Sequence, residues 1–162
     1  MRIQNCRICD SKDLKVVLDY GNVALADSFL TVEEIPNEKK HPLRLCVCGE
    51  CKHVQIDDII DPSILFEHYV WHSGSSTSVI KFADELYENL SSRFGNATPS
   101  VLEIACNDGS ILTVFKNHGC EVLGVDPARN IVEIAKSRGI NAIAKFFNLE
   151  TAKYLNSEFG KK

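Results

Sequence analysis

The sequence lacks several features that would direct it to a membrane, a nucleic acid or a secretory route. No apolar run approaches the roughly 18 residues that a helix needs to cross a bilayer. No run of lysine or arginine exceeds two residues, and the net charge of −4 provides no basic surface for a nucleic acid. The polar N-terminus, MRIQNCRICD, has no signal-peptide core. These absences predict a soluble, cytoplasmic protein with no nucleic-acid or membrane partner.

What the sequence does contain is enough apolar material for a core and an unusual number of cysteines. The 162 residues are 44% hydrophobic and 25% charged, a balance typical of one ordinary domain or two small ones. Seven cysteines in a chain without a secretory signal indicate metal ligands or buried thiols rather than disulfides. The odd count also excludes a framework in which every cysteine is paired.

The hydrophobic pattern changes along the chain. The first third has short alternating stretches that predict strands at 14–20, 43–48 and 53–56. Apolar residues at helical spacing predict a helix at 79–94, with serines of the preceding HYVWHSGSSTSV segment as its cap. From residue 100, strands alternate with helices, which indicates a parallel sheet covered by helices. The expected strands are 100–105, 121–125 and 142–144, and the expected helices are 109–117, 128–137 and 149–155.

Two CxxC pairs lie in the first third of the chain, separated by 38 residues: Cys6 with Cys9, and Cys48 with Cys51. Two such turns supply the four thiolates of a closed, structural zinc site, and Gly49 is expected to ease the second turn. Unligated reduced cysteines and a redox CxxC remain the alternatives, although a redox motif belongs after a strand and at a helix start.

The remaining three cysteines are not predicted to be zinc ligands. Cys46 lies two residues before the second pair and is expected to pack beside the metal site, with a capacity to replace Cys48 if that ligand is lost. Cys106 and Cys120 read as small buried hydrophobes. His53 lies outside the CxxC turn and reads as a surface or packing residue.

The stretch VLEIACNDGSIL places a loop of small residues between a buried strand and a helix. Such a loop lets a ligand approach the backbone, and the helix N-terminus offers N–H groups. Asp126 ends the next strand, 17 residues after Gly109, where an acidic side chain can take both hydroxyls of a ribose. The alternative is a plain strand-to-helix turn followed by an acidic surface residue.

This loop differs from the dinucleotide fingerprint G-x-G-x-x-G, because Ala105 and Asn107 occupy the first two glycine positions. A pyrophosphate would be crowded there. A ligand with an adenosine and an amino-acid tail but no phosphate fits better, and S-adenosylmethionine (SAM) is such a ligand. Another nucleotide remains a possible ligand of the same loop.

Several separated segments together resemble one family, the SAM-dependent C-methyltransferases that act on nucleotide-linked deoxysugars. The segments follow the family's order over essentially the whole chain: CRIC, LDYGNVALADSFL, HPLRLCVCGECKHVQI, YVWHSGSSTS, LEIACNDGSIL and LGVDPARN. Either the cysteine pairs or the loop alone would be generic, whereas their combination with LDYGNVALADSFL is specific.

The resemblance implies roles for individual residues. The zinc ligands would be Cys6, Cys9, Cys48 and Cys51. The SAM site would comprise Glu103, Ala105, Asn107, Asp108, Gly109 and Asp126. Tyr69 corresponds to an aromatic residue close to the family's active site and substrate, and Trp71 stands where the family has a second tyrosine. The alternative for both aromatic residues is packing against the following helix.

The resemblance also implies the fold class, which is α/β. A zinc-binding module of short strands is expected at 1–75, a connecting helix at 76–97, and the first half of a Rossmann-like class I methyltransferase sheet at 98–162. A change of composition near 95–99 is the expected boundary. An edge of this half-sheet is expected to lack its neighbouring strand.

Family members are much longer, and they carry the catalytic base and a C-terminal domain beyond the segments matched here. Methyl transfer to carbon needs a base beside a carbonyl, and neither His72 nor His118 has an evident partner for that role. The expected function is therefore the N-terminal part of such an enzyme, inactive alone, with the nucleotide-linked deoxysugar bound only by the complete enzyme. A partner chain could supply the missing half. The alternative is a non-catalytic zinc-binding interaction module with a degenerate nucleotide-binding half-domain.

Overall fold

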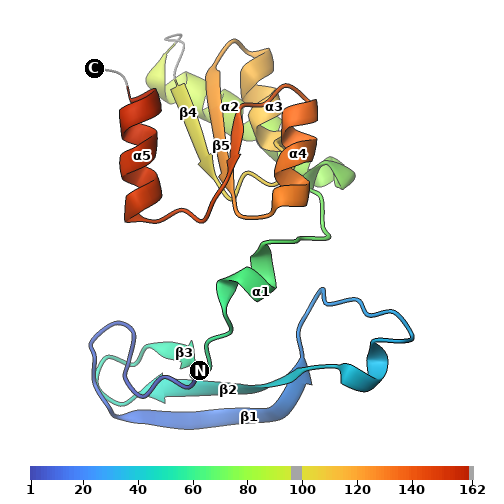
Figure 1. Ribbon diagram of the computed structural model, residues 1–162. Coiled ribbons are helices and arrows are strands. Elements are labelled where there is room, and N and C mark those ends of the chain that lie inside the picture. Colours follow the sequence, from blue (N-terminus) through green and yellow to red (C-terminus); the bar gives the residue numbers. More distant parts are fainter. Residues whose placement is uncertain (96–99, 161–162) are drawn as a thin grey trace. The chain divides into compact units, whose positions relative to one another are not determined.

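The computed structural model describes residues 1–95 and 100–160, and it divides the chain into two compact units, Met1–Leu65 and Phe66–Lys162 (Figure 1). The expected boundary near 95–99 falls mainly on residues 96–99, which lie outside the described residues. The helix expected as a connector makes its contacts within the second unit, where it packs against another helix.

Unit 1 contains a three-stranded antiparallel sheet in the order β1-β2-β3. The strands are β1 (Leu14–Ala24), β2 (Lys40–Cys48) and β3 (Val54–Ile56), so all three expected strands are present. The pairing of β1 with β2 shifts register between Val16 and Leu18 and again between Asp19 and Asn22. A 3-10 turn, η1 (Ile35–Asn37), interrupts the loop before β2, and α1 (Pro62–Phe66) follows the sheet.

The buried side of unit 1 is built from cysteines rather than from large apolar side chains. Among its described residues, the buried hydrophobic side chains are Cys6, Cys46 and Cys48, whereas Val16 and Leu18 are 49% and 43% exposed. On β2 the buried positions therefore belong to the face with the cysteines, not to the alternate face with leucine and valine. A module with so little apolar core needs another source of stability, and a bound metal is the usual one.

Unit 2 is an α/β domain with a parallel sheet in the order β4-β5-β6, as expected. Its strands are β4 (Ser100–Ile104), β5 (Glu121–Asp126) and β6 (Ala142–Ala144). Its helical elements are η2 (Ser73–Ser75), α2 (Thr77–Phe94), α3 (Ser110–Asn117), α4 (Arg129–Ser137) and α5 (Leu149–Phe159). Helix α2 starts at residue 77, two residues before the expected start. Its N-cap residue Ser76 makes no side-chain capping bond, so the predicted serine cap is wrong.

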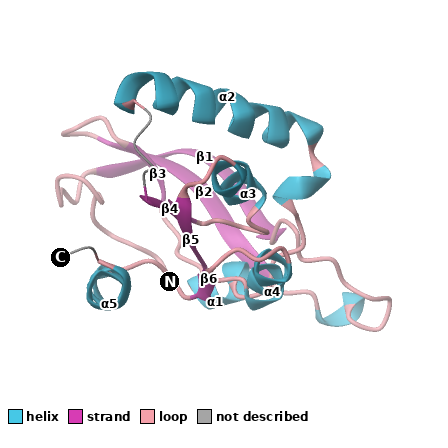
Figure 2. Cartoon of the chain, turned by 90° about the horizontal axis from the view of Figure 1, so that it is seen from above, coloured by secondary structure: helices cyan, strands magenta, loops and turns pink. Residues whose placement is uncertain are grey.

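The sheet of unit 2 has α3 and α4 on one face and α5 on the other (Figures 1 and 2). The core lies on the α3 and α4 side, with Cys106, Leu112, Val132, Ala135, Ile140 and Ala142. On α2, Tyr87 stacks on His118 with ring centroids 3.8 Å apart and meets the Phe115 ring edge-on at 5.6 Å. These contacts explain His118 as a packing residue of the α2–α3 interface. Cys106 and Cys120 are both buried, as expected.

Within the described parts of the chain, no helix combines the length and the apolar character needed to span a membrane.

Candidate functional site

The four expected zinc ligands lie together in unit 1. The sulfur atoms of Cys6, Cys9, Cys48 and Cys51 all lie within 4.8 Å of one another. The Sγ atoms of Cys6 and Cys51 are 3.6 Å apart, as are those of Cys9 and Cys48. A tetrahedral zinc ion with bonds of about 2.3 Å requires sulfurs about 3.8 Å apart. The cluster therefore has the size of a closed four-thiolate zinc site, with no position left for a substrate.

The two CxxC turns share one hydrogen-bonding pattern. The residue after each pair donates its N–H to the carbonyl of the first cysteine: Asp10 to Cys6 over 3.0 Å, and Lys52 to Cys48 over 3.1 Å. Both donors have a left-handed backbone, with φ of 60° and 63°. In addition, the first cysteine of each pair donates its own N–H to the carbonyl five residues later. The repeated geometry positions the paired sulfurs in the same way in both turns.

Gly49 is required by a close approach rather than by an unusual backbone angle. Its N–H donates to the carbonyl of Asp13 over 2.7 Å, and a Cβ atom placed on it would lie 1.7 Å from Asp13 Oδ2. Gly49 is not among the residues with positive φ. The expectation that Gly49 eases the turn is therefore replaced by a steric reason: the chain between the first turn and β1 packs directly onto the second turn.

Gln55 connects the first CxxC turn to β3, a role that the sequence did not reveal. Its buried side-chain oxygen accepts the N–H of Arg7, inside the first turn, over 2.9 Å. The side-chain nitrogen of Gln55, Nε2, donates to the carbonyl of Asn5 over 3.4 Å. A single amide on β3 thus holds the N-terminal ligand pair beside the pair that follows β2.

The electrostatics of the thiols favour a bound cation. N–H groups of Cys9 and Ile8 lower the pKa of Cys6, and those of Cys51 and Glu50 lower the pKa of Cys48 to about 7. At Cys51 the N–H of His53 lowers the pKa, but desolvation and the neighbouring sulfurs outweigh it and raise the pKa to about 12. Without a cation the cluster can ionise only in part, and a divalent metal removes that restriction. Cys46 is 1% exposed, and burial raises its pKa, in keeping with a packing role.

Unit 2 has a cavity of about 400 Å³ at the carboxyl ends of its strands. This is the edge at which parallel α/β sheets bind their ligands. Its lining is mostly apolar and comes from four segments: Phe66, Tyr69, Ile104, Ala105, Val125, Asp126, Pro127, Lys145, Phe146 and Phe147. Three residues predicted from sequence, Tyr69, Ala105 and Asp126, therefore line one cavity.

The backbone N–H groups of the loop between β4 and α3 form hydrogen bonds within the protein. Ala105, Asn107 and Gly109 all have positive φ, at 60°, 49° and 71°. Each N–H from residue 105 to residue 110 donates within unit 2, to carbonyls of Val125 and Cys106 or to side chains of Asp126, Asn107 and Asp108. For residues 105–110, the expectation that the N–H groups lie free for a ligand is wrong. This arrangement also disfavours a pyrophosphate, which needs such donors.

Asp126 is buried and holds two backbone segments at once. Its Oδ2 accepts the N–H of Asn107 over 2.9 Å, and its Oδ1 accepts the N–H of Ala128 over 2.9 Å. A carboxylate has about four acceptor positions, so each oxygen keeps capacity for a ligand hydroxyl on the cavity side.

Glu103 lies next to this carboxylate on β4. Desolvation, with the charges of Asp126 and Asp108, raises the pKa of Glu103 to about 7. Its Oε2 is buried and has no hydrogen-bond partner among the described residues. Glu103 does not itself line the cavity, but it directly precedes Ile104 and Ala105, which do. An unpartnered buried carboxyl oxygen is suited to a cationic or hydrogen-donating ligand group.

The remaining predicted residues of the loop face the protein. Asp108 is 0% exposed and forms an ion pair with Arg138 at 3.0 Å, while Gly109 packs toward Ile140 and Ala135. The side-chain amide of Asn107 bonds to backbone groups of residues 71 and 73. These partners were not predicted, and neither were Lys145, Phe146 and Phe147. The last three directly follow the third parallel strand, a position from which they could have been expected at this edge.

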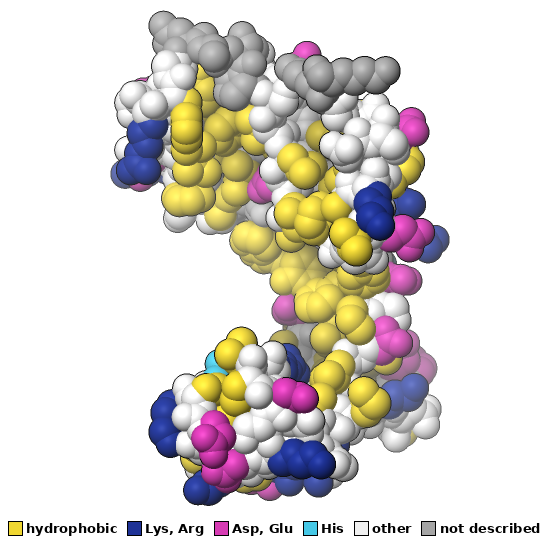
Figure 3. All heavy atoms as spheres, turned by 90° about the vertical axis from the view of Figure 1, so that its left-hand side faces the viewer, with side chains coloured by type: hydrophobic (Ala, Val, Ile, Leu, Met, Phe, Trp, Pro, Cys, Tyr) yellow, Lys and Arg dark blue, Asp and Glu magenta, His cyan; other side chains and the backbone are white. Residues whose placement is uncertain are grey.

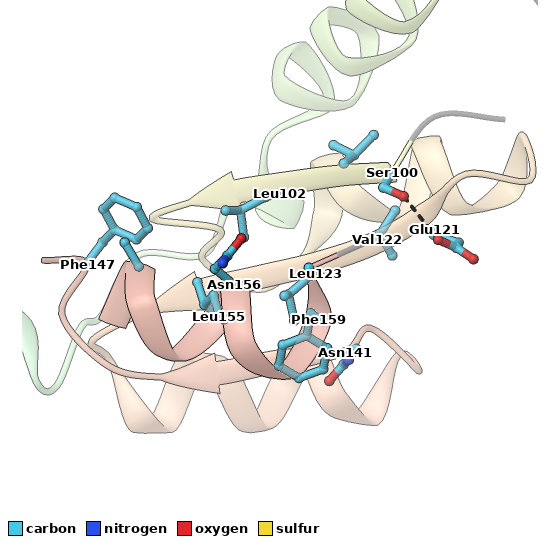
Figure 4. Close-up of a pocket in the computed structure, with 13 residues that line it drawn as sticks. Ser100, Leu102, Glu121, Val122, Leu123, Asn141, Phe147, Leu155, Asn156 and Phe159 are labelled. Carbon is cyan, nitrogen blue, oxygen red and sulfur yellow. Dashed lines mark hydrogen bonds between the residues drawn. The ribbon is translucent and has the colours of Figure 1, made fainter. Parts of the chain in front are cut away.

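A larger cavity of about 520 Å³ lies between the sheet and α5, and Figure 4 shows its lining. Ser100 Oγ donates there to Glu121 over 3.0 Å, and most of the other labelled side chains are apolar, among them Leu102, Leu155 and Phe159. It includes the amino ends of β4 and β5, away from the strand ends where Asp126 lies. We therefore place the candidate ligand site in the smaller cavity.

Comparisons with known proteins give three matches. Residues 6–66 match the family Methyltransf_13, described as "Putative zinc binding domain". The chain is 31% identical over 160 residues to the C-methyltransferase NovU of Streptomyces niveus, covering 98% of this chain and 38% of that protein. A solved SAM-dependent methyltransferase from Archaeoglobus fulgidus is 25% identical, with a TM-score of 0.31, over 46% of this chain and 33% of its own.

The first match covers the cysteine domain, and the second covers nearly the whole chain, including that domain. The chain spans little more than a third of the length of the curated relative, and the similarity includes both units. The chain thus contains a segment that matches a zinc-binding domain model, and nearly all of it is similar to part of a C-methyltransferase.

Proposed function

We propose that the chain forms the zinc-stabilised N-terminal part of a SAM-dependent C-methyltransferase, with a nucleotide-linked deoxysugar as the methyl acceptor of the complete enzyme. The observation that carries the proposal is the cavity at the carboxyl ends of β4, β5 and β6, which Asp126, Ala105 and Tyr69 line together. The relationship to a C-methyltransferase supports the reaction class. The sugar acceptor rests on the resemblance described from the sequence.

Residues in and near the cavity suit the separate chemical groups of SAM, which are the ribose, the adenine and the amino-acid tail. Asp126 is suited to the ribose hydroxyls, and the apolar side chains of Pro127 and Phe146 are suited to the flat adenine ring. The unpartnered Oε2 of Glu103 is suited to the α-amino group, which donates hydrogen bonds and carries a positive charge. When bound, SAM supplies an electrophilic methyl group on a sulfonium.

The acceptor carbon must be made nucleophilic by removal of a proton beside a carbonyl. The groups on the described cavity lining that can exchange a proton are Tyr69, Asp126 and Lys145. Asp126 is committed to two backbone N–H groups, and neither His72 nor His118 lines the cavity. Neither this carboxylate nor a histidine is therefore available as the base at the described cavity, and we propose that methyl transfer needs residues from outside this chain.

A partner for the sheet is part of the proposal. β4 is an edge of the described sheet, and its Leu102 and Ile104 are 46% and 52% exposed. Hydrophobic side chains also gather on the exposed surface of unit 2 in Figure 3, and large apolar residues of α5 such as Leu149 are exposed. Exposed edges and apolar faces of this kind pair with further strands and helices. We propose that the remainder of a complete enzyme, or a partner chain, covers this face.

Titration calorimetry of the zinc-loaded chain tests the ligand class. S-adenosylhomocysteine and SAM should bind with a stoichiometry of one, whereas NAD and ADP, which contain a pyrophosphate, should bind much more weakly. Tight NAD binding would favour another nucleotide ligand. Absence of heat with every ligand, on a sample shown to be folded, would support the alternative of a non-catalytic zinc-binding module.

A further inference from the structure

An irregular segment, residues 69–74, begins at the candidate SAM cavity and is bonded to the loop after β4 and to α4. Only residues 73–75 of this region form a 3-10 turn, so regular backbone bonding does not fix its path. Tyr69 at its start lines the cavity. The position of Tyr69 therefore depends on how the segment is attached.

An asparagine at the start of α4 attaches the first residue of the segment at two points. Tyr69 donates its N–H to Asn130 Oδ1 over 3.1 Å, and Asn130 Nδ2 donates to the carbonyl of Tyr69 over 2.7 Å. The adjacent N–H of Arg129 donates to the carbonyl of Glu67 over 3.2 Å. Asn130 itself is not part of the cavity lining. Its amide thus fixes the backbone of Tyr69 without contacting the ligand space.

The loop after β4 attaches the other end of the segment in the same manner. Asn107 Nδ2 donates to the carbonyl of Trp71 over 3.1 Å, and Asn107 Oδ1 accepts the N–H of Ser73 over 2.9 Å. Asp108 Oδ2 accepts the N–H of Gly74 over 3.0 Å. Each side-chain amide uses both its donor and its acceptor on the segment, which an apolar or a singly functional side chain could not do.

The segment approaches the loop so closely that Gly74 has no room for a side chain. A Cβ atom there would lie 2.6 Å from Ser110 Oγ, 2.9 Å from Asp108 Oδ2 and 3.0 Å from a terminal nitrogen of Arg138. Arg138 in turn bonds to Ser110 Oγ over 2.7 Å and pairs with Asp108 at 3.0 Å. The attachment is therefore a packed network rather than a pair of surface contacts.

We propose that Asn130 is a positioning residue, which acts together with Asn107 to hold residues 69–74 in place, so that Tyr69 is preformed as part of the lining of the SAM cavity. This inference rests on the proposed function for the identity of the ligand. The attachment itself is independent of it. If the segment is held in place in only a tenth of molecules once Asn130 is lost, the apparent ligand affinity falls about tenfold.

The single tryptophan of the chain, Trp71, lies inside the segment and reports on it directly. In Asn130→Ala, acrylamide should quench Trp71 fluorescence more strongly than in the wild type, and S-adenosylhomocysteine should bind about tenfold more weakly. In Asn130→Asp, which keeps an acceptor for the Tyr69 N–H but loses the donor to its carbonyl, both effects should be intermediate. The matched control is Asn117→Ala, an exposed asparagine at the end of α3, which should behave as the wild type.

Unchanged quenching and unchanged affinity in folded Asn130→Ala would overturn the inference. If the alanine variant does not fold, unchanged quenching in Asn130→Asp would do the same. If the wild type does not bind S-adenosylhomocysteine, the proposed function fails, while the quenching comparison still decides whether Asn130 holds the segment.

Discussion

The backbone N–H of Asn107 donates to the side chain of Asp126 over 2.9 Å, joining the loop after β4 to the end of β5. Asn107 is at the same time bonded through its side chain to residues 71 and 73. The acid suited to the ribose, the small-residue loop and the aromatic segment are thereby connected in one network. A substitution in one of these three parts is therefore expected to change the backbone position of the other two.

Loss of a zinc ligand should unfold unit 1. We expect Cys48→Ser to lose the metal and the antiparallel sheet, because structural zinc contributes about 10 kcal/mol or more to small domains with little core. Metal analysis and amide-proton spectra provide the measurement. Cys46→Ser is the matched control, since this buried thiol lies outside the cluster of four sulfurs, and it should retain one zinc per chain. Because Cys46 is expected to be able to replace Cys48, the ligand assignment is refuted if Cys48→Ser and Cys51→Ser both stay folded with a full zinc content.

Gln55→Ala should weaken zinc binding without removing a ligand. The amide of Gln55 fixes the backbone inside the first CxxC turn, and outer contacts of this kind typically change metal affinity about 10- to 100-fold. Competition with a chromogenic chelator measures the effect. The exposed Gln4 supplies the control variant Gln4→Ala, which should compete as the wild type does. Equal affinities for all three proteins would show that Gln55 does not support the site.

Glu103 should make unit 2 less stable as the pH rises. Its pKa is raised to about 7 in the folded protein from an ordinary 4.5, so the folded state retains a proton that the unfolded state releases. Stability from this group is therefore lost between about pH 4.5 and pH 7, and the loss is complete above pH 7. We expect Glu103→Gln to be the more stable protein at pH 8 by up to about 2 kcal/mol, with little difference at pH 4.5.

Denaturant unfolding followed by Trp71 fluorescence measures this difference in unit 2. Glu158→Gln, which alters an exposed carboxylate on α5, is the control and should follow the wild type at every pH. If Glu103→Gln is destabilised equally at both pH values, the side chain of Glu103 makes a stabilising hydrogen bond in the folded protein, and the prediction is wrong.

Asp126→Asn should reduce the affinity for S-adenosylhomocysteine about tenfold, because a carboxylate accepts from two ribose hydroxyls and an amide keeps only one acceptor oxygen. Since Asp126 also accepts two backbone N–H groups, some loss of stability should accompany the change. Calorimetry at a temperature where the variant is folded separates the two effects. Asp84→Asn, at an exposed position on α2, should bind as the wild type does. An Asp126→Asn protein with full affinity would remove Asp126 from the ligand site.

The helices and strands were predictable because periodicity and turn residues are local signals. The alternation of 100–105, 109–117 and 121–125 indicated a parallel sheet, and the structure has β4, α3 and β5 at nearly the same residues. The spacing of Cys48 and Cys51 selected them over Cys46, and the four sulfurs do converge. Local patterns of this kind need no knowledge of tertiary contacts.

The side-chain partners were not predictable, because they depend on which distant segments meet. Asn107 is bonded to residues more than thirty positions earlier, and Asn130 to Tyr69, which lies 61 positions earlier. The burial of cysteines rather than leucines on β2 likewise follows from the cluster they form with residues 6 and 9. The loop and Asp126 could be located from local patterns, whereas the network that holds residues 69–74 could not.

The most direct test of the SAM site is a nuclear magnetic resonance titration of the zinc-loaded chain with S-adenosylhomocysteine, which reports both binding and its location. We expect backbone shifts concentrated at Tyr69, Ala105, Asp126 and Phe146, with residues of the zinc cluster unaffected. A titration without shifts, or with shifts confined to the cavity beneath α5, would contradict this expectation.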